Sequence, residues 1–211
     1  MPTMEQAKQW YEGVDAIHDF SHIQRVYHMA ERLAKTEGAD LEIVHAAALL
    51  HDSRGTMPGS GERAEHHLAS AVFAKEVLAA EGWPPDRIAA VQHCIRAHRF
   101  RDKRERPETI EAKVLFDADK LDVLGAVGVM RTLGYALLAG EPPYVEPSQH
   151  FLDTGEKEPG EPHSAYHEYL FKLRKIKDVL FTAAARGVAE GRDAYLAEFF
   201  RRFAAESRGE M

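Results

Sequence analysis

Apolar residues recur at intervals of three and four along most of this chain, which limits the folds it can adopt to helical ones. Between residues 21 and 35 they follow the spacing of one helix face, at Ile23, Val26, Ala30, Leu33 and Ala34. No stretch of useful length alternates apolar with polar residues, as a half-buried strand would. We therefore predict an all-α protein, with helices at about 21–35, 41–51, 64–80, 86–98, 109–120, from there to 139, 164–181 and 190–206.

The segment 41–51 is apolar nearly all round, so we expect a buried central helix there. Asp40 is its expected N-cap, and Gly38 is the expected end of the preceding helix. The chain has 211 residues, a length that suits one domain, and we predict a single helical bundle over 1–211. Residues 140–163 are rich in Pro and Gly, so we expect a long loop of the kind that forms lids and binding loops.

Composition argues against several classes of protein. The only cysteine, Cys94, excludes an internal disulfide and a multi-cysteine zinc site. No apolar run has the length of a membrane span, and no secretory signal is visible, so we expect a cytoplasmic protein without a membrane partner. Lys and Arg number 27 against 34 Asp and Glu, a net charge of −7, so we expect no nucleic-acid partner. The unusual number is the 12 histidines, because histidine is the commonest metal ligand.

Histidine and aspartate side chains gather where the sequence predicts burial. His51 and Asp52 stand at the end of the apolar segment 41–51, and charged groups in such a place need a partner or a metal ion. Asp117, Asp119 and Asp122 lie close together on a later helix and repel one another. A divalent cation held by imidazoles and carboxylates satisfies both places, and it selects Asp119 as its ligand.

Each of these signals also has a plain structural explanation. A His-Asp pair is usually a helix C-terminus with a favourable dipole contact. An Asp-x-Asp pair is more often solvated or a cap, and His22 by itself fits a solvated first turn of a helix. The ordered set of His22, His51-Asp52 and Asp119, each on an expected helix, is what favours a metal site.

This set resembles the H…HD…D signature of the HD-domain superfamily of metal-dependent phosphohydrolases. The surrounding sequence is similar to one bacterial branch, the YpgQ/YedJ-like proteins. Four stretches carry this likeness, in the same order, and they are His18–Val26, Ala47–Asp52, Ile95–His98 and Asp117–Gly128. The likeness continues into the C-terminal helices, so it covers nearly the whole chain.

The resemblance implies an HD-domain helical bundle with one divalent metal held by His22, His51, Asp52 and Asp119. It also implies hydrolysis of nucleoside triphosphates, often to the monophosphate and pyrophosphate, with manganese. Two imidazoles and two carboxylates suit manganese, iron, cobalt or nickel better than a thiolate-rich zinc site does, and magnesium stays open. Some HD branches carry a Glu-Asp pair shortly after the His-Asp pair, and its absence from residues 53–56 argues against alarmone hydrolysis.

Three side chains are the first candidates for catalysis. Asp52 is expected to orient or deprotonate the attacking water as well as to bind the metal. Lys120 follows a predicted ligand, and Arg25 lies three residues after His22. Both cations are expected to bind phosphate oxygens and to stabilise the charge that grows on them.

Further histidines have less defined roles. His93 and His98 lie on the 86–98 helix and are candidates for phosphate binding, proton transfer or a second metal site. His66 and His67 are candidates for that second site, and His18 is a candidate partner for a metal ligand.

Other functions stay open at this point. The same fold and metal site suit a 5′-nucleotidase or a cyclic-nucleotide phosphodiesterase, and a non-catalytic sensor that binds a metal and a nucleotide is the alternative outside enzymes. The expected partner is a small phosphate compound, most simply a nucleotide, and a homodimer is a further open expectation.

Overall fold

The computed structural model describes residues 1–12, 20–54, 65–99 and 104–211, and all regular structure in these ranges is helical. This confirms the predicted all-α class. The chain divides into two compact units. Unit 1 comprises Met1–Lys120 and Leu180–Ala185, and unit 2 comprises Leu121–Val179 and Arg186–Met211. The expectation of a single domain over 1–211 stays a prediction.

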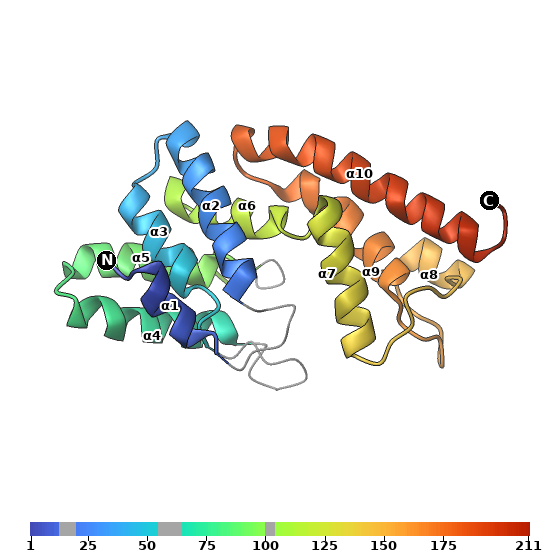
Figure 1. Ribbon diagram of the computed structural model, residues 1–211, viewed down its shortest axis with the longest axis horizontal. Coiled ribbons are helices and arrows are strands. Elements are labelled where there is room, and N and C mark those ends of the chain that lie inside the picture. Colours follow the sequence, from blue (N-terminus) through green and yellow to red (C-terminus); the bar gives the residue numbers. More distant parts are fainter. Residues whose placement is uncertain (13–19, 55–64, 100–103) are drawn as a thin grey trace. The chain divides into compact units, whose positions relative to one another are not determined.

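Figure 1 shows the helices in chain order. The first six are α1 (Met4–Trp10), α2 (Phe20–Glu37), α3 (Leu41–Leu50), α4 (His66–Ala80), α5 (Pro85–Ala97) and α6 (Ile110–Leu121). They are followed by α7 (Gly125–Leu138), α8 (Gln149–Thr154), α9 (Ala165–Phe171), the 3-10 helix η2 (Leu173–Val179) and α10 (Ala183–Ser207).

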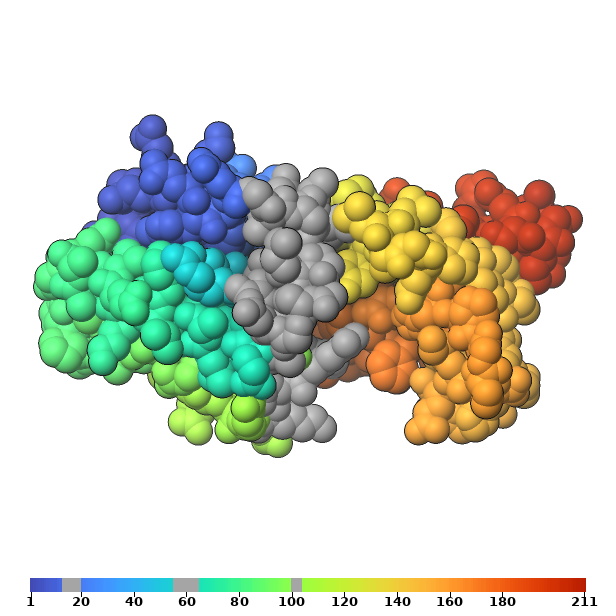
Figure 2. Space-filling view, turned by 90° about the horizontal axis from the view of Figure 1, so that it is seen from below, coloured from blue at the N-terminus to red at the C-terminus, as the bar shows by residue number. Residues whose placement is uncertain are grey.

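The centre of unit 1 is α3, as the sequence predicted. Val44, Ala47 and Leu50 have no exposed surface, and α2 and α5 pack against this helix. The Asp40 carboxylate caps α3 by accepting from the amides of residues 42 and 43, and Gly38, with φ of +73°, follows the end of α2. In the space-filling view, α4 and α5 cover the face of unit 1 beside α1 (Figure 2).

Asp117, on α6, is fully buried and has a structural role within unit 1. Its carboxylate accepts from the amides of Phe181 and Thr182 at 2.9 and 2.8 Å, and from the Thr182 hydroxyl at 2.7 Å. These bonds attach the segment 180–185 to α6, and this segment includes the first residues of α10. The sequence left Asp117 outside the predicted ligand set, and its contacts agree with that choice.

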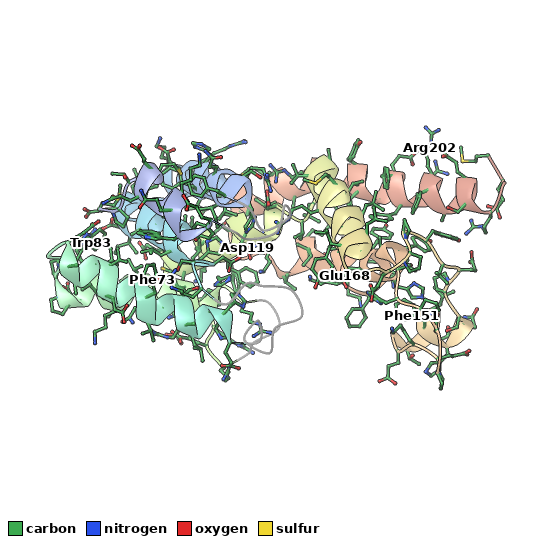
Figure 3. All side chains as sticks on the ribbon, turned by 60° about the horizontal axis from the view of Figure 1, so that its bottom comes forward. Phe73, Trp83, Asp119, Phe151, Glu168 and Arg202 are labelled. Carbon is green, nitrogen blue, oxygen red and sulfur yellow. The ribbon has the colours of Figure 1, made fainter. Side chains whose placement is uncertain are left out.

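The predicted loop at 140–163 contains a short helix, α8, and the prediction of an uninterrupted loop was wrong. Residues 148–154 contain no Pro or Gly. The Ser148 hydroxyl caps α8 by accepting from the Phe151 amide at 3.0 Å, and Gly155, with φ of +79°, follows its last residue. Figure 3 labels Phe151, whose buried ring anchors α8 within unit 2.

The Glu161 carboxylate connects several parts of this segment. One oxygen of Glu161 accepts from the Ser148 amide at 2.8 Å and lies 3.0 Å from Nε2 of the buried His167. The other oxygen accepts from the Ser148 hydroxyl and from the Glu158 amide. The segment 140–163 is therefore an ordered part of unit 2 with its own internal bonds.

Three other element boundaries differ from the prediction. The expected helix at 164–181 is α9 followed by η2, with a break at Lys172, and α10 begins at Ala183 instead of residue 190. Helix α1 was not predicted from the sequence, and it begins with a capping box between Thr3 and Gln6. Within the described ranges, no single helix is long and apolar enough to cross a membrane, although α6 and α7 pass the same test when counted together.

Candidate metal centre

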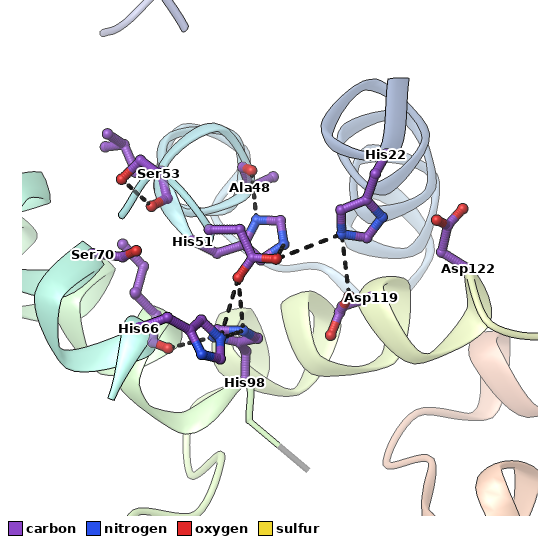
Figure 4. Close-up of polar contacts among 12 residues, drawn as sticks. His22, Ala48, His51, Ser53, His66, Ser70, His98, Asp119 and Asp122 are labelled. Carbon is purple, nitrogen blue, oxygen red and sulfur yellow. Dashed lines mark hydrogen bonds and ion pairs between the residues drawn. The ribbon is translucent and has the colours of Figure 1, made fainter. Parts of the chain in front are cut away.

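Three of the four predicted metal ligands converge in unit 1. His22 on α2, His51 at the end of α3 and Asp119 on α6 each offer a ligand atom, and these atoms all lie within 4.8 Å of one another. His22 Nε2 is 3.5 Å from Asp119 Oδ1. Both histidines are buried, with 1% and 0% exposure. Figure 4 shows this group between α2 and α3, which are consecutive in the sequence, and α6, which is distant from both.

The fourth predicted ligand, Asp52, faces four imidazoles with its two oxygens. Oδ2 lies 3.9 Å from His22 Nε2 and 3.7 Å from His51 Nε2. Oδ1 lies 3.3 Å from His66 Nε2 and 3.4 Å from His98 Nε2. Asp52, His66 and His98 thus form a second group with metal-ligand spacing. The carboxylate of Asp52 joins the two groups.

Backbone contacts fix the proton on two of these rings. His51 Nδ1 lies 2.8 Å from the Ala48 carbonyl and His98 Nδ1 lies 2.6 Å from the Ile95 carbonyl. A carbonyl oxygen only accepts, so both Nδ1 atoms donate. In the neutral ring the proton is then on Nδ1, and the Nε2 lone pair points at the Asp52 carboxylate. Lone pairs that face a carboxylate repel it unless a cation lies between them.

Two buried atoms of the site also indicate a place for a cation. Among the described residues, His51 Nε2 and Asp52 Oδ1 have no hydrogen-bond partner. Buried polar atoms without a partner are costly, and those of an imidazole and a carboxylate are the ones a transition-metal ion takes as ligands. The residues present therefore fit a divalent cation.

The charges in the site shift several pKa values. Burial by itself raises the pKa of Asp52, but His51, His66 and His98 outweigh burial and hold it well below its usual range. Burial raises the pKa of Asp119 too, and Lys120 is the largest influence that lowers it below the ordinary value. Burial lowers the pKa of His98 to about 4. At neutral pH the carboxylates are charged and His98 is neutral, which is the state that binds a metal.

Lys120 and Arg25 lie in unit 1 near predicted ligands. Lys120 Nζ is 2.5 Å from the second oxygen of Asp119 and its side chain is 11% exposed. Arg25 follows His22 by one helical turn, and its guanidinium donates to the Ser21 hydroxyl at 2.9 Å. Their predicted contacts with phosphate stay predictions.

The structure separates His93 from the two groups. Its Nδ1 lies 2.6 Å from a Glu105 carboxylate oxygen, and its Nε2 accepts from the Glu108 amide at 3.2 Å. Both ring nitrogens are thus engaged by the segment that follows α5, so we do not include His93 in the proposed site. His18 lies outside the described residues, and His67 is buried beside His66 with its ring centroid 5.5 Å away.

His66 is the site residue whose place was hardest to predict from the sequence. It stands at the start of α4, and its Nε2 is 3.4 Å from His98 Nε2 on α5. The only sequence signal was a pair of adjacent histidines before an apolar helix. This pair made His66 a candidate ligand but did not predict its contact with Asp52.

The chain belongs to the HD-domain family. A family model described as the HD domain matches residues 19–124, which include all six side chains of the two groups and Lys120. The fold agrees, because the chain superimposes on a solved structure of an HD-superfamily hydrolase from Bacillus thuringiensis with a TM-score of 0.70 and 29% identity. That match covers 97% of this chain and 94% of the other.

A second relative matches in both sequence and structure. The chain is 31% identical over 204 residues to the uncharacterized protein YpgQ of Bacillus subtilis (strain 168), covering 93% of this chain and 90% of that protein. A crystal structure of Bacillus subtilis YpgQ in complex with ADP superimposes with a TM-score of 0.73 and 29% identity, covering 99% of this chain and all of the other. The YpgQ-like resemblance predicted from the sequence is thereby confirmed.

Proposed function

We propose that this protein is a divalent-cation-dependent phosphohydrolase that cleaves nucleoside triphosphates to a monophosphate and pyrophosphate. The observation that carries the proposal is the buried centre of His22, His51, Asp52 and Asp119. Within the described residues, this centre leaves an imidazole nitrogen and a carboxylate oxygen without hydrogen-bond partners. The nucleotide part of the proposal is supported by the ADP in the YpgQ crystal structure.

In the proposed mechanism, the cation and the side chains of the protein have different roles. When bound, a divalent cation supplies a water of lowered pKa and polarises a phosphoryl oxygen. His22, His51, Asp52 and Asp119 would hold this cation, and the Asp52 carboxylate would orient the attacking water and serve as its proton acceptor. Lys120, next to Asp119, binds an oxygen of the phosphate chain and offsets the charge that develops there.

We assign no covalent nucleophile. Cys94 is fully buried, and burial raises the pKa of its thiol. The Ser53 hydroxyl is adjacent to Asp52 in sequence, but it donates to the Leu50 carbonyl at 2.9 Å. Direct attack by water therefore fits the described residues better than a phosphoenzyme.

The test is hydrolysis of dATP, ATP and AMP by protein stripped of metal and then supplied with Mn²⁺, with pyrophosphate and phosphate measured separately. We expect pyrophosphate from both triphosphates and no product without added metal. A matched control is Asp86→Asn, because Asp86 is an exposed carboxylate of α5 away from the ligand groups. It should leave turnover unchanged.

Other outcomes identify the alternatives. Phosphate released from AMP indicates a 5′-nucleotidase, and ring opening of a cyclic nucleotide indicates a phosphodiesterase. Tight binding of Mn²⁺ and nucleotide without any hydrolysis indicates a sensor. Each of these results overturns the pyrophosphohydrolase proposal.

The number of cations is a separate question that the Asp52 carboxylate raises. We assign one cation, preferably manganese, to His22, His51, Asp52 and Asp119, while Asp52 Oδ1 faces His66 and His98. Metal analysis of dialysed protein tests this assignment. If the wild type holds one equivalent of metal and His66→Ala retains it, the result supports a single cation. If the wild type holds two equivalents and His66→Ala loses one of them, Asp52 bridges two cations.

A further inference from the structure

The carboxyl end of α3 is capped by three side chains. A helix end leaves its last carbonyl groups without intrahelical partners. The His51 ring takes the Ala48 carbonyl at 2.8 Å, and the Ser53 hydroxyl takes the Leu50 carbonyl at 2.9 Å. The carbonyl between them, that of Leu49, accepts from the Tyr11 hydroxyl at 2.8 Å. Of the three caps, Tyr11 is the one that comes from a distant part of the chain.

Tyr11 also touches the helix that carries His22. Its ring centroid lies 5.9 Å from that of Phe20, the first residue of α2 and two positions before His22. The ring belongs to a buried cluster with Ile23 and Leu49 and is only 4% exposed. One side chain thus contacts α2 beside one predicted ligand and α3 beside two others.

The short helix α1 sets the position of Tyr11. A helix of seven residues is too short to be stable without tertiary contacts. The Thr3 and Gln6 capping box begins α1, and Tyr11 follows its last residue with its amide donating to the Lys8 carbonyl. Burial, and then the charge of Asp52, raise the pKa of the Tyr11 phenol well above its usual value, so the hydroxyl remains a donor.

We propose that Tyr11 is a positioning residue for the cation, which holds the His51–Asp52 turn of α3 against the start of α2 so that their ligand atoms converge. This proposal rests on the proposed function of the site, because it assumes that these residues bind a divalent cation. It assigns a task in the metal centre to the described residues 1–12, among which no metal ligand is predicted.

The experiment compares Tyr11→Phe with the wild type in the full chain. The substitution removes the hydroxyl and keeps the ring, and loss of a group that supports metal ligands costs about tenfold or more in metal affinity. We expect the dissociation constant for Mn²⁺, measured by competition with a coloured chelator, to rise about tenfold. At non-saturating metal, kcat should fall while KM for the nucleotide stays unchanged.

Two variants make the result specific. Tyr27→Phe is the matched control, because Tyr27 also lies on α2 in unit 1 but stacks on His45, at 4.4 Å between ring centroids, and it should leave the Mn²⁺ constant unchanged. Ser53→Ala removes the neighbouring cap on Leu50 and should weaken Mn²⁺ binding in the same direction. If circular dichroism shows that Tyr11→Phe does not fold, Ser53→Ala decides.

A lowered melting temperature of Tyr11→Phe with an unchanged Mn²⁺ constant overturns the proposal, because Tyr11 is then a packing residue only. The electron paramagnetic resonance spectrum of bound Mn²⁺ gives a second reading, since a displaced ligand changes its line shape. These readouts do not depend on nucleotide hydrolysis. A wild-type protein that binds Mn²⁺ and hydrolyses nothing defeats the proposed function and leaves this test intact.

Discussion

Asp52→Asn is the substitution that tests the metal centre most directly. It keeps the size of the side chain and removes its negative charge. In the folded protein the two Asp52 oxygens lie 3.3 to 3.9 Å from four imidazole nitrogens. A cation that contacts both the carboxylate and these nitrogens is therefore within about 4 Å of the charge that the substitution removes.

The size of the effect follows from that distance. Two unit charges 4 Å apart attract by about 4 kcal/mol at an effective dielectric constant of about 20. The cation carries two charges, and the amide oxygen of Asn restores part of the loss, so we take about 4 kcal/mol as a lower estimate. That free energy corresponds to a dissociation constant about a thousandfold weaker. Turnover at micromolar Mn²⁺ should disappear with binding.

The metal-free protein gives a second comparison. Without a cation, His51, His66 and His98 hold the pKa of the Asp52 carboxyl well below its usual range, so its charge stabilises the folded chain at neutral pH. The melting temperature of metal-free Asp52→Asn, measured by calorimetry after chelation, should therefore lie below that of the metal-free wild type. A folded Asp52→Asn protein whose Mn²⁺ dissociation constant is within tenfold of the wild type would refute the assigned site.

Three other substitutions separate substrate binding from stability. Lys120→Met should raise KM for the triphosphate about tenfold, since it removes a phosphate contact worth about 1.4 kcal/mol. Mn²⁺ should stay bound because Asp119 remains, and loss of the metal would show that Lys120 positions Asp119 instead. Glu161→Gln should make the free energy of unfolding depend less on pH in the acid range. The pKa of Glu161 is lowered to about 2, first by the Ser148 amide, so its contribution is complete above the ordinary carboxyl pKa and is lost as pH falls toward 2. Urea unfolding between those pH values measures this, and equal slopes in both proteins would contradict it. Asp117→Asn should lower the free energy of unfolding, measured with urea, by about 3 kcal/mol. The reason is that the amide group of Asn places a donor against backbone and hydroxyl groups that are themselves donors. A decrease of less than about 1 kcal/mol would show that the carboxylate can be replaced.

The helices could be predicted where local sequence and tertiary burial agree. The apolar segment 41–51 has no polar face, so it had to lie in a core, and Asp40 supplied its cap. Element ends were predicted less well in unit 2. The short run from Ser148 to Thr154 forms a helix inside a stretch whose overall composition favours a loop, because its own residues include neither Pro nor Gly.

The metal ligands that the sequence revealed share one property. His51 and Asp52 follow an apolar run, and Asp119 lies on a helix whose other faces are buried. In each case polar groups stand where the pattern requires burial, and only a partner from elsewhere removes that conflict. His93 shows the limit of this reasoning. It lies on the same helix as the buried Cys94 and Ile95, yet its contacts are with the segment after α5.

His66 carries no such conflict in its own sequence, because a polar first turn of a helix is ordinary. Its place in the site depends on the packing of α4 against α5, which brings it to His98 across 32 positions of the chain. The carboxylate of Asp52 is where the two kinds of residue meet. Oδ2 faces the histidines predicted as ligands from the sequence, and Oδ1 faces the pair that only the fold brings together. Substitutions of His51 and His66 therefore act on different oxygens of one side chain. Their effects on Mn²⁺ affinity should add if each pair holds its own ion, and should not add if one ion is shared.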